Sequence, residues 1–215
     1  MKGFICTLGF DEKFILRFMV RHKVGENDIF IIIVPEDYKS NEKSFNAYKS
    51  VIDFLQTILP SQNIHTITTN IYGDPIEEIR KISTKILDLI SATNIVHAAL
   101  SGGMRVLVIE VLLSLIFLSL NNPLNIFVEV DFENLRGRTV FPLTPLLLRK
   151  NRRYILILKR IEELKDSRIK ILAQNTGLSP ATISRELSSI RNLGLIDHEN
   201  RLTKLGKAYL SLYSG

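Results

Sequence analysis

With 215 residues, 46% of them hydrophobic and 23% charged, the chain has the composition of one or two folded domains, which excludes disordered and collagen-like classes. A single cysteine, Cys6, excludes an internal disulfide and a four-cysteine zinc site, and it favours a cytoplasmic location. The formal net charge of +6 is uneven, because residues 1–148 carry 14 Lys and Arg against 16 Asp and Glu, and residues 149–215 carry 14 against 6. We therefore predict two domains, 1–148 and 149–215, of which only the second is drawn to polyanions.

The first 141 residues alternate between short apolar runs and longer segments with helical spacing. This alternation is typical of an α/β fold with a doubly wound, mostly parallel sheet and one antiparallel element at its edge. The pattern predicts strands at 3–8, 29–34, 64–69 and 95–100, helices at 11–21, 44–59, 75–90 and 104–120, and a hairpin with strands at 125–132 and 139–141 around a turn at 134–138.

The N-terminus and residues 104–120 are the segments that could direct the chain to export or to a membrane. The N-terminus lacks the charged and apolar regions of a signal peptide, so we expect none. Residues 104–120 are the most apolar stretch, but Arg105 and Glu110 interrupt it, and a membrane-spanning helix needs about 20 apolar residues. We predict a helix buried in the fold or at an interface, and no association with a membrane.

The loops after the first and fourth strands are the candidate binding site, because doubly wound sheets bind ligands outside the carboxyl ends of their strands. Gly102 and Gly103 let a ligand approach the backbone, and the following helix start and Arg105 favour an anion such as phosphate. A tight turn with a solvated Arg105 is an equally open alternative. The candidate ligand-binding residues are Thr7, Leu8, Gly9, Phe10, Asp11, Leu100, Ser101, Gly102, Gly103, Met104 and Arg105.

Several catalytic patterns are missing from the sequence. No G-x-G-x-x-G follows the first strand and there is no P-loop motif, which disfavours a dinucleotide oxidoreductase and a P-loop NTPase. Ser101 lacks the G-x-S-x-G surroundings of a nucleophile, and the four histidines show no metal-ligand spacing. We therefore expect no catalytic residue, no metal and no cofactor.

The last 67 residues predict a winged helix-turn-helix. Helices are expected at 154–164 and 168–176, and Gly177 ends the second one. Ser179 is a suitable N-cap and Pro180 a suitable first residue for a third helix that runs to Asn192. Short strands at 195–197 and 201–203 would form the wing, and a closing helix is expected at 205–212. This order is typical of DNA binding, and a small helical oligomerisation domain is the alternative.

The third helix of this region has one apolar face, formed by Ile183, Leu187 and Ile190. Arg185 lies opposite that face and is expected to enter a major groove, whereas Arg191 lies about 80° from Ile183 and is expected to reach backbone phosphate. The candidate DNA-binding residues are Ser179, Thr182, Arg185, Ser188, Ser189, Arg191, Asn192, Asn200 and Arg201.

Together these features resemble the CRISPR-associated Rossmann fold (CARF) winged-helix transcriptional regulators of archaea, over essentially the whole chain. The segment Thr7-Leu8-Gly9-Phe10 is similar to the first ligand loop of that family, and Ser101-Gly102-Gly103-Met104-Arg105 to the second, which is the more specific. The resemblance implies a Rossmann-like domain that forms a homodimer, and paired loops that hold a cyclic oligoadenylate, typically cyclic tetra-adenylate, across the two-fold axis.

The resemblance also implies that this allosteric ligand changes the pose of two winged helices on palindromic promoter DNA. The expected function is therefore a CRISPR-associated transcriptional regulator without required catalysis. Some CARF proteins cleave their ligand slowly as ring nucleases, and this activity in the same pocket is the alternative. Residues 111–120 are more apolar than one side of a small sheet needs, which favours a homodimer through the first domain.

Overall fold

The computed structural model describes residues 1–134 and 136–213 and divides the chain into two compact units, Met1–Phe141 and Pro142–Gly215. Sequence placed the boundary between residues 148 and 149, whereas helix α5 (Leu143–Leu147) packs on α9 (Lys204–Tyr213) of the second unit. The hydroxyl of Tyr213 also donates to the carbonyl of Leu148 at 2.6 Å. These contacts assign the segment after β6 to the second unit.

The first unit contains a six-stranded sheet in the order β3-β2-β1-β4-β5-β6. Strands β1 to β5 pair in parallel, and β6 lies beside β5 at the edge, so the predicted α/β fold with a mostly parallel sheet is confirmed. This is the strand order of Rossmann folds, in which the chain reverses direction across the sheet between the first and fourth strands. The strands are β1 (Gly3–Thr7), β2 (Ile29–Pro35), β3 (Ile64–Thr69), β4 (Ile95–Ala99), β5 (Asn125–Asp131) and β6 (Arg138–Pro142).

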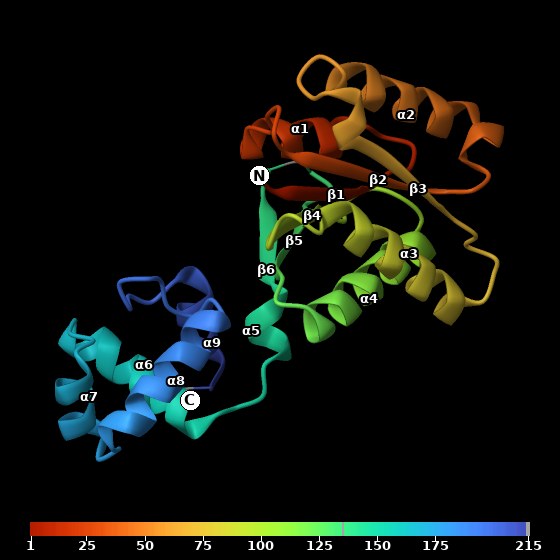
Figure 1. Ribbon diagram of the computed structural model, residues 1–215. Coiled ribbons are helices and arrows are strands. Elements are labelled where there is room, and N and C mark those ends of the chain that lie inside the picture. Colours follow the sequence, from red (N-terminus) through yellow and green to blue (C-terminus); the bar gives the residue numbers. More distant parts are fainter. Residues whose placement is uncertain (135, 214–215) are drawn as a thin grey trace. The chain divides into compact units, whose positions relative to one another are not determined.

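Four helices cover the two faces of this sheet (Figure 1). Helices α1 (Lys13–His22) and α2 (Glu42–Leu55) lie on one face, and α3 (Pro75–Ile90) and α4 (Arg105–Asn121) lie on the other. Helix α3 begins where Asp74 accepts hydrogen bonds from two first-turn amides. Because helices shield both faces, β1 is buried throughout and β2 is buried from Phe30 onward, which explains the uninterrupted apolar run of β2.

The end of α2 differs from the sequence prediction, and one predicted turn lies partly outside the described residues. Helix α2 was expected to reach residue 59, but the hydroxyl of Thr57 donates to the carbonyl of Phe54 at 2.6 Å and the chain turns there. Local side-chain bonding of this kind competes with a continuing helix. The predicted turn at 134–138 includes Leu135, which lies outside the described residues.

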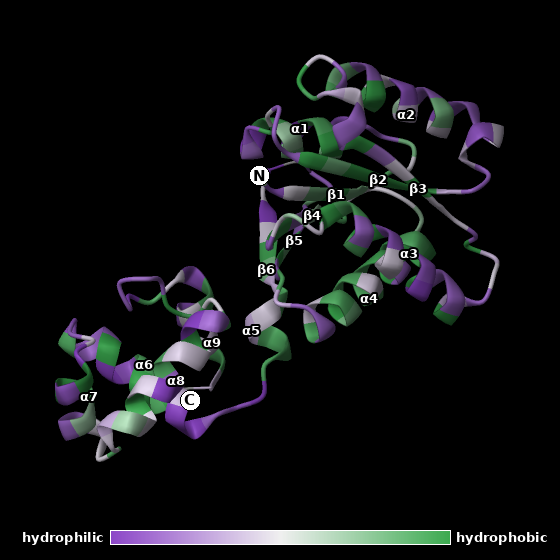
Figure 2. Ribbon diagram, viewed as in Figure 1, coloured by the Kyte–Doolittle hydropathy of each residue, from purple (hydrophilic) through white to green (hydrophobic). Residues whose placement is uncertain are grey.

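Helix α4 is apolar over most of its surface (Figure 2). Its inner face, with Leu107, Val111 and Leu115, is fully buried against the sheet and α3. Its outer face is also apolar, and the side chains on it are exposed. Within the described residues, no helix is both long and apolar enough to span a membrane.

The second unit contains α5, α6 (Arg152–Leu164), α7 (Ile169–Thr176), α8 (Pro180–Asn192) and α9. Gly177 ends α7 with a φ of 70°, and the Ser179 hydroxyl accepts the Thr182 amide at 3.1 Å, so α8 begins as predicted. The two expected wing strands are reduced to one isolated antiparallel bridge between Ile196 and Leu202 within the described residues.

Close packing fixes that bridge against the last helix. A Cβ added at Gly206 would lie 2.1 Å from the carbonyl oxygen of Leu195, so α9 can approach the bridge only with a glycine at this position. Ile183, Leu187 and Ile190 of α8 are buried, as their spacing predicted. The opposite face of α8 is therefore presented outward from this core.

Candidate ligand-binding site

The two glycine-containing loops meet at the carboxyl ends of β1 and β4, which are neighbours in the sheet. A Cβ added at Gly9 would lie 2.8 Å from both the amide nitrogen and the Cα of Gly103, and one at Gly102 would lie 3.0 Å from the carbonyl oxygen of Thr7. The Thr7 hydroxyl donates to the Gly102 carbonyl and joins the loops further. The glycines therefore serve first to let two backbones touch.

The second loop leads directly into the N-terminus of α4. Gly103 has a φ of 102°, which favours glycine, and the N-cap residue Met104 provides no side-chain hydrogen bond to the first turn. The first-turn amides of α4 are thus free to bind an anion. The side chain of Arg105 is exposed beside them, and among the described residues no acidic group lies within ion-pair distance of it.

A cavity of about 250 Å³ opens beside these loops. Leu8, Gly9, Phe10 and Met104 of the predicted set line it. The rest of the wall follows the carboxyl ends of β2 and β3 and was not predicted from the sequence. The strand-end rule points to these residues when it is applied to the second and third predicted strands as well as to the first and fourth. They are Pro35, Asp37, Tyr38, Ser40, Asn41, Ser44 and Tyr72.

Three other residues of the predicted set hold the loops in place. Ser101 accepts a hydrogen bond from the Asp131 amide at 2.7 Å, and the amide of Leu100 donates to the carbonyl of Glu129 at 3.0 Å. Asp11 accepts the Lys13 amide at 2.9 Å at the start of α1. These bonds tie the second loop to β5 and the first loop to α1.

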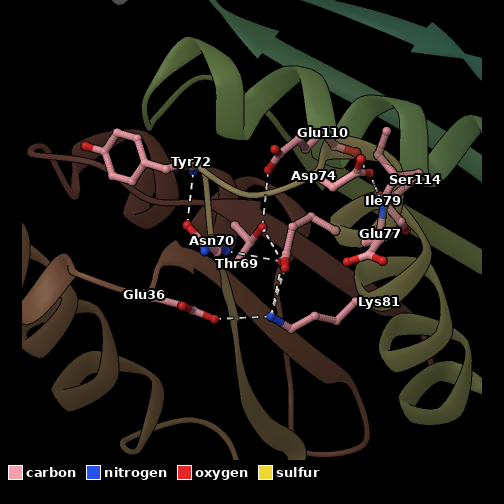
Figure 3. Close-up of polar contacts among 11 residues, drawn as sticks. Glu36, Thr69, Asn70, Tyr72, Asp74, Glu77, Ile79, Lys81, Glu110 and Ser114 are labelled. Atoms are coloured by element: carbon pink, nitrogen blue, oxygen red, sulfur yellow. Dashed lines mark hydrogen bonds and ion pairs between the residues drawn. The ribbon is translucent and has the colours of Figure 1, made fainter.

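A polar network supports the wall of the cavity that follows β3 (Figure 3). Thr69, the last residue of β3, is fully buried, and its hydroxyl oxygen lies 2.9 Å from Glu78 Oε2 and 3.2 Å from Glu110 Oε2. Glu78 also accepts the Asn70 amide at 3.2 Å and the Lys81 ammonium at 3.1 Å. The network connects the loop that carries Tyr72, whose amide donates to Asn70, with α3 and α4.

The two carboxyl groups of this network are shifted in opposite directions. Burial raises the pKa of Glu110. Burial alone would also raise the pKa of Glu78, but hydrogen bonds from Thr69, Lys81 and the Asn70 amide outweigh it and lower that pKa. Thr69 has a single hydroxyl proton and cannot donate fully to both, so a protonated Glu110 can donate to the Thr69 oxygen while Thr69 donates to Glu78.

A second polar cluster lies on the other face of the sheet, beneath the second loop. Glu129 of β5 is 1% exposed and contacts His22 Nε2, Arg138 Nε at 3.0 Å and Arg21 Nη2 at 3.4 Å. Arg21 also binds Asp131 through two bonds of 2.7 and 2.9 Å. Burial tends to raise the pKa of Glu129, but the His22 hydrogen bond and the charges of His22, Arg138 and Arg21 lower it.

His97 of β4 joins this cluster, with its Nδ1 atom 4.0 Å from Glu129 Oε1. Burial lowers the pKa of His97 to about 4, and the nearby His22 contributes to this shift. The imidazole is therefore neutral at neutral pH. Sequence spacing indicated isolated histidines, whereas the fold brings two of the four together with a buried carboxylate.

The candidate DNA-binding residues in the second unit fall into two groups. Arg185, Ser188 and Asn192 are exposed on the outer face of α8. Ser189 is half-buried on the same helix, while Ser179 and Thr182 bond to each other at its N-terminus. Arg185 Nη2 lies 3.8 Å from the buried carboxylate of Glu186, which sequence analysis did not single out.

The remaining candidates are engaged within the unit. Arg191 donates to the side chain of Asn200, which has a φ of 60° in the turn after Ile196. Arg201 pairs with Asp197 at 2.9 Å and with Glu199 at 2.8 Å. Arg191 and Arg201 therefore stabilise this turn. Arg185 is the more exposed of the two arginines on α8.

Comparison with known proteins identifies the first unit. A family model, the Csa3 CRISPR-associated Rossmann-like domain, matches residues 2–142. No curated protein matches the chain. Two solved structures align at low identity: Enterococcus italicus Csm6 bound to cyclic hexa-2'-fluoro-hexa-dAMP has a TM-score of 0.49 and 8% identity, with 89% of this chain and 55% of that chain covered.

The second is Can2 from Sulfobacillus thermosulfidooxidans in complex with cyclic tetra-adenylate (cA4), with a TM-score of 0.40 and 10% identity, and with 98% of this chain and 57% of that chain covered. The chain thus spans little more than half the length of these two proteins.

Proposed function

The chain belongs to the family of Csa3 CRISPR-associated Rossmann-like domains through residues 2–142, and from this premise we propose that it is a ligand-responsive transcriptional regulator. The proposed ligand is a cyclic oligoadenylate, with cyclic tetra-adenylate as the first candidate. The observation that carries the proposal is the contact between the two glycine loops. The second of these loops leads into the N-terminus of α4, where no side chain caps the first-turn amides and Arg105 is exposed. These groups are suited to phosphate.

The remaining wall of the cavity is suited to the other part of a nucleotide. Phe10 and Tyr72 line it and are 61% and 79% exposed, so each offers a ring face to a base. Stacking of a base on an aromatic side chain contributes about 1–3 kcal/mol. Aromatic side chains in the cavity, together with the N-terminus of α4 that Met104 brings to its wall, favour a nucleotide over inorganic phosphate as the ligand.

We propose that the protein acts as a homodimer through the outer face of α4. Val106, Ile109, Leu113, Phe117 and Leu120 are each more than two-fifths exposed and recur at intervals of three and four, so they form one apolar stripe. Such a stripe is typical of an interface. Because Arg105 begins the same helix, pairing α4 with its copy would bring two sets of loops to one symmetric ligand.

DNA binding is assigned in this proposal to the second unit. The net positive charge of residues 149–215 supports an interaction with phosphate, and the turn and cap between α7 and α8 have the form of a helix-turn-helix. The polar outer face of α8, with Arg185, Ser188 and Asn192, would enter the major groove of promoter DNA. Ligand binding would then change how two such units are placed on a palindromic site.

A titration of cyclic tetra-adenylate into the purified protein tests the ligand, with cyclic hexa-adenylate and linear tetra-adenylate as matched controls. We expect one ring to bind per two chains and the linear molecule to bind more weakly, since it lacks the two-fold symmetry. Absence of binding to both rings would refute the proposal. Chromatography of radiolabelled ligand after incubation distinguishes binding from ring-nuclease activity. More than one ligand molecule cleaved per binding site would show that the protein is an enzyme.

A further inference from the structure

Three potential metal ligands converge beneath the second loop from three different elements. His22 lies at the end of α1, His97 in β4 and Glu129 in β5, and one ligand atom of each lies within 4.8 Å of the other two. The Nδ1 atom of His97 is buried and has no hydrogen-bond partner among the described residues. Most buried polar atoms in folded proteins have a hydrogen-bond partner, so this nitrogen is available to a ligand.

The surroundings hold each of these side chains in place without using its ligand atom. The ring of His97 stacks between Phe4 and Phe127, with centroid distances of 5.7 and 5.3 Å. The ring of His22 packs on Phe18 at 4.7 Å. Arg138 binds Oε2 of Glu129, which leaves Oε1 facing the two imidazoles. Such support from outside the ligand set is typical of metal sites.

We propose that His22, His97 and Glu129 form a binding site for a divalent transition-metal ion, with Zn²⁺ the best match to two imidazoles and one carboxylate. The ion would replace the proton that His22 shares with Glu129, and His22 would then carry its proton on Nδ1. Ligand distances to Zn²⁺ are about 2.0–2.2 Å, so the three atoms, which lie within 4.8 Å of one another, would move toward the ion, and a water would complete the tetrahedron.

The charge around the site permits a cation. Among the described residues, Arg21, Arg138 and His22 contact Glu129. The two guanidinium groups lie on its Oε2 side, where Asp131 binds Arg21 through both of its oxygens, and the proton of His22 on the Oε1 side is the one that the ion would replace. The two guanidinium groups and the two carboxylates therefore balance. An added ion on the Oε1 side is opposed by no excess of positive charge.

The expected role of the ion is to position the ligand loop. It would join the end of α1 to β4 and β5, and β5 carries the second loop through the bonds of Leu100 and Ser101 to its backbone. Zinc should therefore stabilise the first unit and leave the chemistry of the cavity unchanged. The proposal does not depend on the identity of the ligand in the cavity.

Zinc titration by calorimetry, with metal analysis by mass spectrometry, tests the site in the full chain purified without a histidine tag and dialysed against chelator. We expect one Zn²⁺ per chain and a higher melting temperature with zinc. His97→Phe should abolish both, because phenylalanine keeps the stack between Phe4 and Phe127 but offers no ligand. His198→Ala, which removes an exposed histidine of the second unit, should change neither.

Unchanged zinc binding by the His97→Phe variant would overturn the assignment, as would a wild-type chain that binds no zinc. Cobalt provides a readout that needs no variant. Co²⁺ bound to nitrogen and oxygen ligands in a tetrahedral site gives visible absorption bands, and zinc should remove them by competition. A wild-type protein that shows no such bands with Co²⁺ would contradict the proposal even if the variant failed to fold.

Discussion

Single glycines allow the two ligand loops to touch, and Gly9 is the most constrained of them. Its added Cβ would meet Gly103 backbone atoms at 2.8 Å, and backbone cannot move aside as a flexible side chain can. We expect Gly9→Ala to lower the free energy of unfolding by about 1–3 kcal/mol, the usual effect of overpacking. Urea denaturation measures this. Gly25→Ala is the control, because its nearest neighbour would lie 3.9 Å away, and an equal loss in both variants would contradict the prediction.

Arg105 is expected to act on ligand affinity and not on stability. Its side chain is exposed, and a charge-assisted hydrogen bond to phosphate contributes about 1.5–3 kcal/mol. Arg105→Ala should therefore weaken the binding of cyclic tetra-adenylate about ten- to a hundredfold at an unchanged melting temperature. Calorimetric titration decides this, with Arg17→Ala on α1 as the matched exposed arginine. Equal affinity of the Arg105 variant and the wild type would remove Arg105 from the site.

Glu110 should make stability fall as pH rises. A carboxyl group whose folded-state pKa is raised keeps its proton longer when folded, so stability decreases from pH 4.5, its ordinary pKa, up to the raised value and is constant above it. Glu110→Gln removes this decrease, since the amide is neutral and can still donate to Thr69. We expect the variant to gain stability over the wild type as pH rises from 4.5 to 8, in thermal melts. A difference that is flat with pH would show that folding does not raise the pKa of Glu110.

At the scale of residues, sequence could indicate the glycine loops because both stand directly after apolar strands and before helices. It could not indicate Thr69, Glu78 and Glu110 as one network, since they come from three elements, β3, α3 and α4, that meet only in the folded unit. The same holds for His22, His97 and Glu129, which come from three elements far apart in the chain. Residue spacing in the sequence can reveal metal-ligating side chains that lie on one helix or strand. It cannot reveal side chains that come together only when the sheet forms.

At the scale of elements, the outer face of α8 is expected to distinguish DNA sequences through Arg185. Arg185→Ala should lower affinity for the operator by about 1–3 kcal/mol and reduce its preference over scrambled DNA. Arg191→Ala should weaken both DNAs alike and lower the salt slope by about one unit if Arg191 reaches a phosphate from its place beside Asn200. Gel shifts at several salt concentrations compare them. Equal losses on both DNAs for the Arg185 variant would mean that α8 is oriented differently.

Periodicity predicted the helices of the first unit because α1, α2 and α3 each bury one apolar face, and the Asp74 cap followed by Pro75 marks the start of α3. It failed where a local contact decides the boundary, as at Thr57, which turns the chain after α2. It also overestimated the strands at 195–197 and 201–203. The apolar residues there serve to pack against α9 at Gly206, and only one bridge forms between them.

At the scale of the whole molecule, the sheet order explains why a cavity forms where it does. The order reverses between β1 and β4, so the loops that follow these two strands meet at one edge of the sheet, and the cavity opens beside them toward the ends of β2 and β3. Sequence could place the strands but not their order in the sheet, so it could not show which strand ends line the same cavity. The difference in net charge between residues 1–148 and 149–215, in contrast, depends on the amino-acid sequence alone and can be read from it directly.

The assembly of two chains is expected to depend on the outer stripe of α4. Phe117 is 51% exposed in the middle of that stripe, and a charge placed there would be buried without a partner in the dimer. We expect Phe117→Glu to shift the protein from dimer to monomer in light scattering at micromolar concentration. The variant should also lose the binding of cyclic tetra-adenylate, because one chain supplies only half of a symmetric site.

Val20→Glu on α1 is the matched control, since Val20 is 69% exposed on the opposite face of the sheet. It should remain dimeric and bind the ligand as the wild type does. A wild-type chain that stays monomeric with and without ligand would refute the dimer. A Phe117→Glu variant that stays dimeric would place the interface on another surface, and the apolar stripe of α4 would then need a different partner.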